Sequence, residues 1–486
     1  MKTRKVDIAI LGAGTAGLAA YRAAREHTEN LVIIDGGPLG TTCARVGCMP
    51  SKLLIAAAEA AHASQHTHKF GVTNTETIVD DVAVLERVRS ERDRFTGFVT
   101  ESIDEFPSEH VVRAYATFVD DQTLQLSNGD QIQADKIVIA TGSRPTHPPI
   151  LDGAGSRLIN NEEIFEFEKL PKKIAVFGPG VIGLELGQAL HRLGVQIKMF
   201  GVGGALGPLR DPVVKDYALT NFSKEFYLDT NVRVESIKEL EHGVLIDYHH
   251  MERGQLQESF DYVLAATGRR PNVDKLDLQN TSLALTERGM PEFDAWTMQC
   301  LGKSNEKSHI FIAGDVNNDR PLLHEAADEG KIAGKNAAFY PQGVRAGLRR
   351  APIGVVFSDP QIATVGLSLD GVKSRCEECY AVGEVSFENQ GRSRVMGINK
   401  GLLRVYGEQG TGLFLGAEMI GPRAEHIAHL LSWAVQQRMT VSQMLDMPFY
   451  HPVVEEGVRT ALRDLNAKLN IGPAVIAHCL DCGPGG

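Results

Sequence analysis

Short apolar runs, glycine turns and amphipathic stretches alternate along the first half of the chain. Residues 6–11 (VDIAIL) are apolar at almost every position, which predicts a buried strand. The glycine-rich run GAGTAG follows, and residues 18–27 have the composition of a helix. A second apolar run at 31–34 predicts another strand. In this order, the segments predict a βαβ unit.

The glycine turn of this unit has the spacing of a dinucleotide-binding site. Gly12 allows a tight turn, Gly14 lets the backbone approach a pyrophosphate, and Gly17 lets helix and strand pack closely. Asp35, directly after the second strand, is placed to hold a ribose hydroxyl. Glycine turns also recur for structural reasons alone, but the flanking strand, helix and acid favour dinucleotide binding.

The same pattern recurs in the middle of the chain. Residues 173–177 (KIAVF) predict a strand, and residues 195–200 (VQIKMF) predict the strand after the helix. The turn between them carries Gly178, Gly180 and Gly183. Two such units imply two dinucleotides, or one donor and one acceptor cofactor.

A strand that ends in Thr-Gly closes each unit. The first phrase (KIVIATG) ends in Thr141 and Gly142, and the second (YVLAATG) ends in Thr267 and Gly268. This repetition suggests two related domains that arose by duplication. A later strand (HIFIAG) leads to Asp315, whose carboxylate suits a ribityl or ribose hydroxyl, with a turn or helix cap as the alternative.

From about residue 352 the pattern changes to short alternating strands followed by helical segments, which indicates an α+β domain. We therefore expect an α/β protein with two Rossmann-like dinucleotide-binding domains and an α+β C-terminal domain that serves dimerisation. The predicted domains are 1–150 with 278–350, 151–277 and 351–470, followed by a tail at 471–486.

Composition and charge exclude several classes of protein. Apolar residues form 43% of the 486 residues and charged residues 23%, which is typical of a folded globular protein. The net charge of −11, without a Lys/Arg-rich run, argues against nucleic acid as a partner. The sequence has neither the ~18–20 consecutive apolar residues of a membrane span nor a cleavable apolar leader, so we expect a cytoplasmic protein with no membrane partner.

Cys43 and Cys48 lie just before an expected helix. In a regular helix, Cα atoms five residues apart are about 8–9 Å apart, beyond the ~7 Å limit for a disulfide. Pairing therefore requires a distorted segment, for which Gly47 and Pro50 are suited. A thiolate near a helix N-terminus is stabilised, which makes it a nucleophile or an electron donor; two buried structural cysteines are the alternative.

The chain resembles the flavin disulfide reductases to about residue 466, because a CxxxxC motif follows GxGxxG and precedes ATG and GD phrases. The resemblance implies that 1–150 with 278–350 bind FAD, and that 151–277 bind NAD(P)H. In such enzymes Cys48 faces the flavin as a charge-transfer thiolate, and Cys43 exchanges with the substrate disulfide. The cofactor-binding residues that it implies in the two units are Gly12, Gly14, Gly17, Asp35, Thr141, Gly142 and Asp315, and then Gly178, Gly180, Gly183 and Gly268.

The resemblance also pairs charged residues. Lys52 and Glu185 match a family pair that lies beside the flavin and tunes its potential, whereas a solvated carboxylate is the alternative for Glu185. The run FYHPVVEE looks like the family motif HPTxxE, with Val453 in place of Thr. It implies that His451, oriented by Glu456, is the base for the cysteines of the other subunit in an obligate homodimer.

The motif CMPSK is closer to the dihydrolipoamide dehydrogenases than to the glutathione reductases. The resemblance therefore favours a dihydrolipoyl dithiol, small or carried on a protein, with NAD⁺ as the acceptor. NADP(H) stays open, because Gly201 stands where NAD enzymes have an acid, and Arg210 is the candidate for a 2′-phosphate. Reduction of another disulfide or of mercuric ion, and a metal-binding or redox-sensing flavoprotein, are the alternatives.

Two further cysteine pairs depart from the family pattern. Cys376 and Cys379 fall in an expected loop of the last domain, and Cys479 and Cys482 fall in the tail. The tail pair has the chemistry to relay electrons to Cys43 by thiol exchange. Incidental thiols, a redox tail and a zinc site built from both pairs are the open interpretations, and we assign no metal site.

Overall fold

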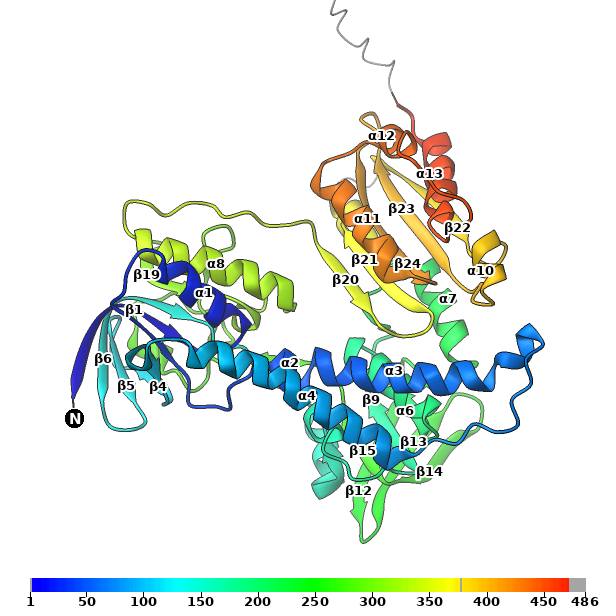
Figure 1. Ribbon diagram of the computed structural model, residues 1–486, viewed down its shortest axis with the longest axis horizontal. Coiled ribbons are helices and arrows are strands. Elements are labelled where there is room, and N and C mark those ends of the chain that lie inside the picture. Colours follow the sequence, from blue (N-terminus) through cyan, green and yellow to red (C-terminus); the bar gives the residue numbers. More distant parts are fainter. Residues whose placement is uncertain (1, 376–377, 472–486) are drawn as a thin grey trace, which may run out of the picture.

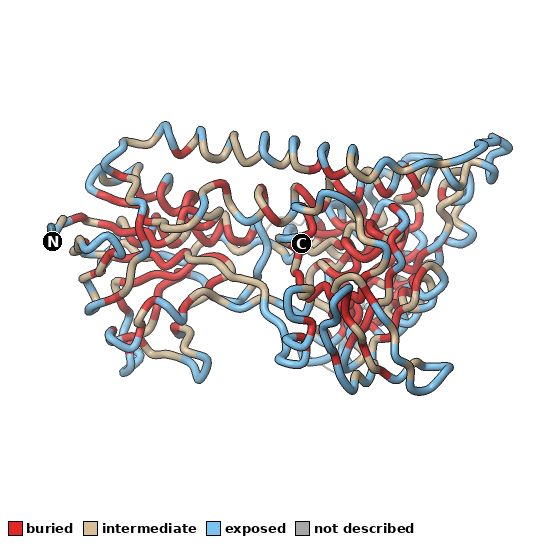
Figure 2. Tube along the Cα trace, turned by 90° about the horizontal axis from the view of Figure 1, so that it is seen from below, coloured by how far each residue is buried: buried red, intermediate tan, exposed pale blue. Residues whose placement is uncertain are grey.

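The computed structural model describes residues 2–375 and 378–471, and within these ranges the chain forms three units, each built around a sheet. In Figure 1 the first unit lies at the left, the second at the lower right and the third at the upper right. Buried segments gather inside the units, whereas the outer loops are mostly exposed (Figure 2).

The first unit has a sheet of order β17-β18-β19-β6-β1-β2-β3, in which β19, β6, β1, β2 and β3 run parallel. Alternate residues of β1 face different layers: Ile8 and Ile10 pack with α1 and α8, whereas Ala9 and Leu11 pack on the other side. Both faces are thus covered, as expected for an apolar parallel strand. The strands are β1 (Thr3–Leu11), β2 (Leu31–Ile34), β3 (Val111–Val112), β4 (Ala116–Phe118), β5 (Thr123–Leu126), β6 (Gln131–Ile139), β17 (Phe293–Asp294), β18 (Gln299–Leu301) and β19 (Lys307–Ile312).

The helices of the first unit close it on one side and extend towards the second unit. Its helices are α1 (Thr15–Arg25), α2 (Thr42–Val46), α3 (Cys48–Gln65), α4 (Asp81–Asp104) and α8 (Leu323–Phe339). α1 and α8 lie against each other, and a Cβ atom at Gly330 of α8 would collide with the backbone of Ala16. α3 continues into the second unit, where Leu54 and Ile55 join its core (Figure 1).

The second unit has a parallel sheet of order β11-β10-β9-β15-β8, covered on one face by the antiparallel layer β12-β13-β14. Its strands are β8 (Leu158–Ile159), β9 (Lys173–Phe177), β10 (Gln196–Phe200), β11 (Tyr227–Asp229), β12 (Arg233–Leu240), β13 (Gly243–His250), β14 (Gly254–Phe260) and β15 (Tyr262–Ala265). Its helices are α5 (Asn161–Ile164), α6 (Val181–Arg192) and α7 (Pro212–Phe222). Between the two units, β7 (Ser143–Pro145) pairs antiparallel with β16 (Arg269–Pro271).

The third unit is an antiparallel sheet of order β20-β21-β24-β23-β22 with helices packed on it. The strands are β20 (Ile353–Val356), β21 (Gln361–Gly366), β22 (Tyr380–Ser386), β23 (Leu402–Glu408) and β24 (Phe414–Gly421). The helices are α9 (Leu369–Arg375), α10 (Gly391–Val395), α11 (Ala424–Gln436), α12 (Val441–Leu445) and α13 (Glu456–Lys468).

The predicted fold class is confirmed, because two parallel βαβ sheets precede an α+β unit. The exact domain limits stay a prediction; Val273 and Leu276 already pack in the core of the first unit, ahead of the predicted return at residue 278. Among the helices of the described ranges, none combines the length and apolar character that a bilayer crossing requires.

Candidate active site

The first glycine turn leaves open space at the N-terminus of α1. Gly12 has φ +105°, and a Cβ atom there would overlap the carbonyl oxygen of Ala140. A Cβ atom at Gly17 would overlap the carbonyl oxygen of Gly12, so helix and strand meet without room for side chains. Gly14, which caps α1, has no atom within 4 Å of its Cβ position. The turn therefore fits a pyrophosphate group at a helix N-terminus.

Asp35 lies beside this turn. Its Oδ2 accepts a hydrogen bond from the N–H of Ala13 at 2.7 Å, and its Oδ1 accepts one from the N–H of Gly37 at 2.7 Å. The carboxylate is thus fixed at the end of β2, where a ribose hydroxyl is expected.

The second glycine turn repeats the first. Gly178 has φ +102°, and a Cβ atom there would overlap the carbonyl oxygen of Ala266. Gly183 packs against the carbonyl oxygen of Gly178, and Gly180 has open space at its Cβ position. Both turns therefore offer the same backbone cradle for a dinucleotide.

The residue expected to distinguish NAD from NADP lies at the end of β10. A Cβ atom at Gly201 would come within 2.7 Å of the Pro179 ring, so the fold leaves no room for an acid at this position. Arg210 is exposed, and its backbone N–H donates to Oε2 of Glu418 in β24 at 2.6 Å. The loop after β10 is thus tied to the third unit at this residue.

The segment between the two cysteines is not a regular helix. α2 ends at Val46, and Gly47 has φ −122° and ψ −115°, outside the helical region. α3 begins at Cys48, so its thiol lies at the N-terminus of a helix. This break brings the two side chains together, and the Cys43 thiol hydrogen-bonds to the sulfur of Cys48. Both cysteines are in the free, reduced form.

The two sulfurs have opposite proton affinities. The hydrogen bond from Cys43 and the charge of Lys52 lower the pKa of Cys48 to about 7, although burial opposes them. The same hydrogen bond and burial raise the pKa of Cys43 well above its ordinary value. Above about pH 7 the reduced pair therefore favours a thiolate at Cys48 and a protonated thiol at Cys43.

Lys52 and Glu185 form a buried link beside the cysteines. The Lys52 Nζ atom lies 2.7 Å from Oε2 of Glu185, and Oε1 of Glu185 accepts a hydrogen bond from the N–H of Phe357 at 2.9 Å. Lys52 also lies over the Phe357 ring, 4.6 Å from its centroid. Glu185 is only 4% exposed, so it is not a solvated helix carboxylate.

A cavity of about 500 Å³ extends from the glycine turn to the cysteines. Cys48 is exposed and lines this cavity. The predicted site residues in its lining are Gly14, Cys43, Cys48, Lys52, Gly142, Glu185 and Asp315. In the described chain, the lining does not include Gly12, Gly17, Asp35 or Thr141. The open turn, the fixed carboxylates and the adjacent cysteine pair together fit a flavin dinucleotide.

Sequence reasoning missed several polar residues of this cavity. The Ser143 hydroxyl donates to Oδ2 of Asp315 at 2.8 Å, and Nε of Arg269 donates to Oγ of Ser143 at 2.8 Å. Ser143 and Arg269 each follow directly after a Thr-Gly phrase, and this position in the sequence could have identified them. Asn161 also lines the cavity, and its Nδ2 donates to the carbonyl of Val46 at 2.6 Å.

The two Thr-Gly phrases meet at the β7–β16 pair. Oγ1 of Thr141 donates to the carbonyl of Asn272 at 2.8 Å, and the carbonyl of Gly268 accepts from the N–H of Thr146 at 3.1 Å. Gly142 and Gly268 both have positive φ. They differ in position, because Gly142 lines the cavity and Gly268 is not part of its described lining.

A second groove leads from the surface to Cys43. It has a volume of about 740 Å³ and lies between α1, α4 and α8. Its apolar wall includes Phe95, Phe98 and Leu323, and its charged rim includes Arg22, Glu26, Lys331 and Lys335. The sequence did not reveal this groove, because three helices far apart in the chain form it. Cys43 lines both this groove and the flavin cavity, whereas Cys48 lines the flavin cavity.

His451 and Glu456 form a pair on the third unit. Nδ1 of His451 lies 3.0 Å from Oε1 of Glu456, and this hydrogen bond lowers the pKa of Glu456. The His451 side chain is 80% exposed. The described residues that line the cavity and the groove lie between positions 14 and 335, so one chain does not bring His451 to Cys43.

The other cysteines have different environments. Cys300 is fully buried, and burial raises the pKa of its thiol. Cys379 is disulfide-bonded. Cys376, Cys479 and Cys482 lie outside the described residues. Within the ranges that the structure describes, no cluster of three or more His, Cys, Asp or Glu side chains is arranged to hold a metal ion.

Comparison with known proteins gives curated relatives along almost the whole chain. The dihydrolipoyl dehydrogenase of Geobacillus stearothermophilus is 30% identical over 456 residues, which is 93% of this chain and 94% of that protein. The mercuric reductase of Shigella flexneri is 30% identical over 485 residues, which is 95% of this chain and 81% of that protein.

Solved structures share the fold. LpdA from Mycobacterium tuberculosis superposes with a TM-score of 0.79 at 23% identity, covering 95% of this chain and 99% of that chain. The HOCl-induced flavoprotein disulfide reductase RclA from Escherichia coli gives a TM-score of 0.78 at 22% identity, with coverage of 95% and 99%.

Two family matches account for most of the chain. Residues 6–330 match pyridine nucleotide-disulphide oxidoreductases, and residues 353–462 match the dimerisation domain of these proteins, which indicates a homodimer. The resemblance inferred from the sequence is confirmed. The chain therefore belongs to the pyridine nucleotide-disulphide oxidoreductase family, whose members are flavoproteins that use FAD and NAD(P)H.

Proposed function

We propose that the chain is a dihydrolipoyl dehydrogenase, which passes electrons from a dihydrolipoyl dithiol through the Cys43–Cys48 pair and FAD to NAD⁺. The observation that carries the proposal is the single cavity in which Cys48, Lys52 and Glu185 lie together with Gly14 and Asp315. This arrangement supports the proposal, because a cysteine with a lowered pKa lines the space that suits a flavin dinucleotide. The curated relatives named dihydrolipoyl dehydrogenase also support it.

The cysteine pair performs the exchange chemistry. In the oxidised enzyme, one substrate thiolate attacks the sulfur of Cys43, and the Cys43–Cys48 bond breaks to leave a thiolate at Cys48. The second substrate thiolate then displaces Cys43, which forms the substrate disulfide and leaves the enzyme pair reduced by two electrons. Bound FAD supplies the two-electron acceptor that reoxidises the pair and the hydride donor for NAD⁺.

His451 manages the protons of this exchange. It takes a proton from the substrate thiol, and it returns one to the departing Cys43. Glu456 fixes its ring orientation and stabilises the protonated imidazole through the 3.0 Å contact with Nδ1. Because one chain does not join His451 to the groove, we propose that each active site takes its histidine from the second subunit.

We propose NAD⁺ rather than NADP⁺ as the acceptor. Position 201 has no acid to hold a ribose diol, and the exposed Arg210 stays the candidate for a 2′-phosphate, so the geometry favours neither nicotinamide. The choice therefore rests on the dihydrolipoyl dehydrogenase relatives.

The groove supports a second candidate substrate, a small disulfide that carries carboxylates. Arg22, Lys331 and Lys335 place three cations on its rim against the one anion of Glu26. Such a rim attracts an anionic disulfide, whereas the apolar wall around Phe98 suits the hydrocarbon chain of a lipoyl group.

Steady-state assays on the purified flavoprotein test the proposal. We expect NAD⁺-linked oxidation of dihydrolipoamide to exceed, in kcat/KM, the reduction of glutathione disulfide, thioredoxin or Hg²⁺. A higher value for glutathione disulfide supports the second candidate. Absence of turnover with every disulfide and dithiol, in protein with bound FAD and intact cysteines, contradicts both. A lipoyl-carrying protein as partner and a cytoplasmic location remain parts of this proposal.

A further inference from the structure

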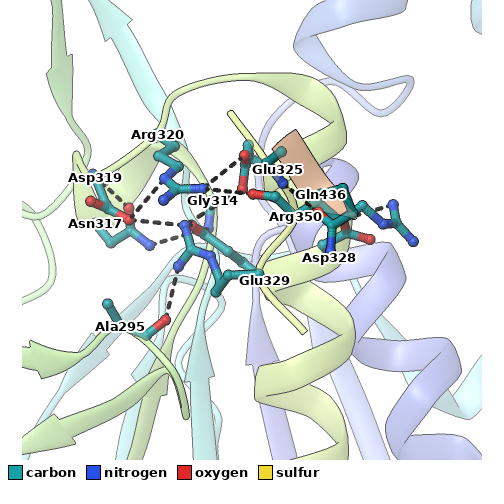
Figure 3. A network of polar contacts seen from close by, with 12 residues as sticks. Ala295, Gly314, Asn317, Asp319, Arg320, Glu325, Asp328, Glu329, Arg350 and Gln436 are labelled. Atoms are coloured by element: carbon teal, nitrogen blue, oxygen red, sulfur yellow. Dashed lines mark hydrogen bonds and ion pairs between the residues drawn. The ribbon is translucent and has the colours of Figure 1, made fainter. Parts of the chain in front are cut away.

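The linker between the first and third units enters a buried cluster of acids (Figure 3). Arg349, near its end, has a side chain that is only 5% exposed. Its Nη1 donates to the carbonyl of Ala295 at 2.9 Å, and its Nη2 donates to Oδ2 of Asp319 at 2.9 Å. The same Nη2 lies 2.9 Å from Oε1 of Glu329. Arg349 thus supplies the buried positive charge of this cluster, whereas Arg320, which is 32% exposed, pairs with Glu325 from the outer side at 3.2 Å.

Glu329 is the most deeply buried acid of the cluster, with a side chain that is 0% exposed. Its Oε2 accepts hydrogen bonds from the N–H of Gly314 at 2.8 Å and from Nδ2 of Asn317 at 2.7 Å. Burial raises the pKa of Glu329, while the Gly314 N–H and the Arg349 charge lower it. An ionised carboxylate at this position therefore depends on its cation.

The turn that Glu329 holds is part of the flavin cavity. Gly314 and Asp315 both line that cavity, and Asn317 ends the short 3₁₀ turn that Asp315 begins. Gly314 has φ +80°, and a Cβ atom there would lie 2.8 Å from Cβ of Ala16 in α1. The turn is therefore tightly placed between α1 and α8, and Glu329 fixes it from behind.

The same linker enters the third unit two residues later. The N–H of Ala351 donates to Oε1 of Gln436 in α11 at 2.7 Å, and β20 then begins at Ile353. Arg350 takes the exposed side of the linker, where Nη1 lies 2.8 Å from Oδ2 of Asp328 and the side chain is 56% exposed. Neighbouring arginines thus have distinct positions, one buried behind the flavin cavity and one on the surface.

We propose that Arg349 is a positioning residue for FAD: by neutralising Glu329 it holds the Gly314–Asn317 turn, and it links the retention of FAD to the seating of the dimerisation unit. The proposal rests on the proposed function, in which Asp315 binds the flavin nucleotide. Without Arg349, Glu329 either takes up a proton or draws water into the cluster, and both changes weaken its hold on the Gly314 N–H.

The test measures FAD binding in the full-length enzyme. FAD-free protein is titrated with FAD, and binding is followed by the quenching of flavin fluorescence, for wild type, Arg349→Gln, Arg349→Lys and the exposed control Arg350→Gln. We expect Arg349→Gln to raise the dissociation constant by at least about tenfold, which corresponds to about 1.4 kcal/mol. Arg349→Lys restores part of the affinity because it keeps the charge, and Arg350→Gln binds as wild type does.

A second background separates positioning from a general loss of folding. In Glu329→Gln the carboxylate that holds the Gly314 N–H is uncharged, although Arg349 still faces Asp319 and the buried Glu325. Adding Arg349→Gln therefore changes the dissociation constant by less than about threefold. Equal FAD affinity in Arg349→Gln and wild type, or an equal loss in both backgrounds, overturns the proposal. If Arg349→Gln does not accumulate as folded protein, the comparison is made between Glu329→Gln and the double variant. A tenfold difference between their dissociation constants for FAD overturns the proposal.

Asp315→Asn distinguishes this proposal from the proposed function. Weak FAD binding in Asp315→Asn with normal binding in Arg349→Gln overturns the positioning role alone. Wild-type binding in Asp315→Asn overturns the assignment of this cavity to the flavin, and the positioning role with it.

Discussion

At the scale of single residues, the chemistry depends on one asymmetric pair of sulfurs. Cys48 gains a hydrogen bond from Cys43, a nearby Lys52 and the N-terminus of α3, and each of these favours its thiolate. Cys43 lines the groove as well as the flavin cavity, and it keeps its proton. This asymmetry supports the proposal that Cys48 donates electrons to the flavin and that Cys43 exchanges with the substrate.

The thiolate of Cys48 predicts a specific pH dependence. Because its pKa is lowered to about 7, the charge-transfer absorption of the two-electron-reduced enzyme is present above that pH and is lost as the pH falls through it. Lys52→Met removes one stabilising charge and moves this loss to higher pH. The measurement is the long-wavelength absorbance against pH. Retention of the band in Cys48→Ser would contradict the assignment of the sulfur.

The pair of His451 and Glu456 predicts a graded loss of activity. Removing the base with His451→Gln lowers disulfide turnover by about 10²–10⁴-fold, since general acid–base catalysis contributes this much. Glu456→Gln causes a smaller loss, because the imidazole remains but is less well oriented. The matched control is Glu455→Gln on the neighbouring residue, with turnover close to wild type. Stopped-flow rates of dithiol oxidation check this series, and equal effects at 455 and 456 would argue against the pairing.

At the scale of elements, close packing of α1 and α8 fixes the first glycine turn. Gly330 touches the backbone of Ala16, two residues after Gly14, so these helices approach without side chains between them. A distortion of this contact displaces the N-terminus of α1, where the pyrophosphate is expected. Helix packing and cofactor binding are therefore linked in this unit.

Gly330→Ala tests this link. The added methyl group overlaps the α1 backbone, so we expect a loss of about 1–3 kcal/mol in the free energy of unfolding, together with a lower content of bound FAD. Gly97→Ala in α4 is the matched control, because its Cβ position is open and alanine favours a helix by about 0.5–1 kcal/mol. Urea unfolding gives the free energy of unfolding of each variant, and flavin fluorescence gives its content of bound FAD. A Gly330→Ala protein as stable as wild type would refute the tight contact.

Local patterns predicted the βαβ units, because apolar strands and glycine turns determine them over short stretches of chain. The break at Gly47 could also be predicted, because a regular helix would hold the Cα atoms of Cys43 and Cys48 too far apart for a disulfide. The hydrogen bond between Arg269 and Ser143 was not predicted, because it forms between residues far apart in the sequence. The groove between α1, α4 and α8 was missed for the same reason. Arg349 was missed for the same reason, as its acidic partners lie on other elements.

At the scale of the whole molecule, the proposed base His451 lies on the third unit, whereas the cysteines lie in the first. Large apolar side chains on this unit are exposed in the single chain, among them Leu430, Trp433, Met447 and Tyr450. Residues 353–462 match a dimerisation domain, so we propose that a second subunit covers these side chains. A dimer that joins His451 of one subunit to Cys43 of the other completes two equivalent sites.

Mixed dimers test this sharing of sites. Cys43→Ser and His451→Gln are each inactive as homodimers, but a mixed dimer holds one complete site. Random exchange of the two variants therefore restores about one quarter of wild-type activity, as expected for a symmetric dimer. Each variant incubated alone is the control. No recovery of activity in mixtures shown by mass spectrometry to contain mixed dimers would mean that the histidine does not act across the interface.

The central claim is that Cys43 and Cys48 exchange electrons with the bound FAD, and anaerobic titration with NADH tests it most directly. Flavin and disulfide each accept two electrons, so wild type takes up about two equivalents of NADH per flavin and passes through a stage with charge-transfer absorption. The Cys43→Ser/Cys48→Ser protein takes up about one equivalent and lacks this absorption. Equal uptake by both proteins would contradict the account.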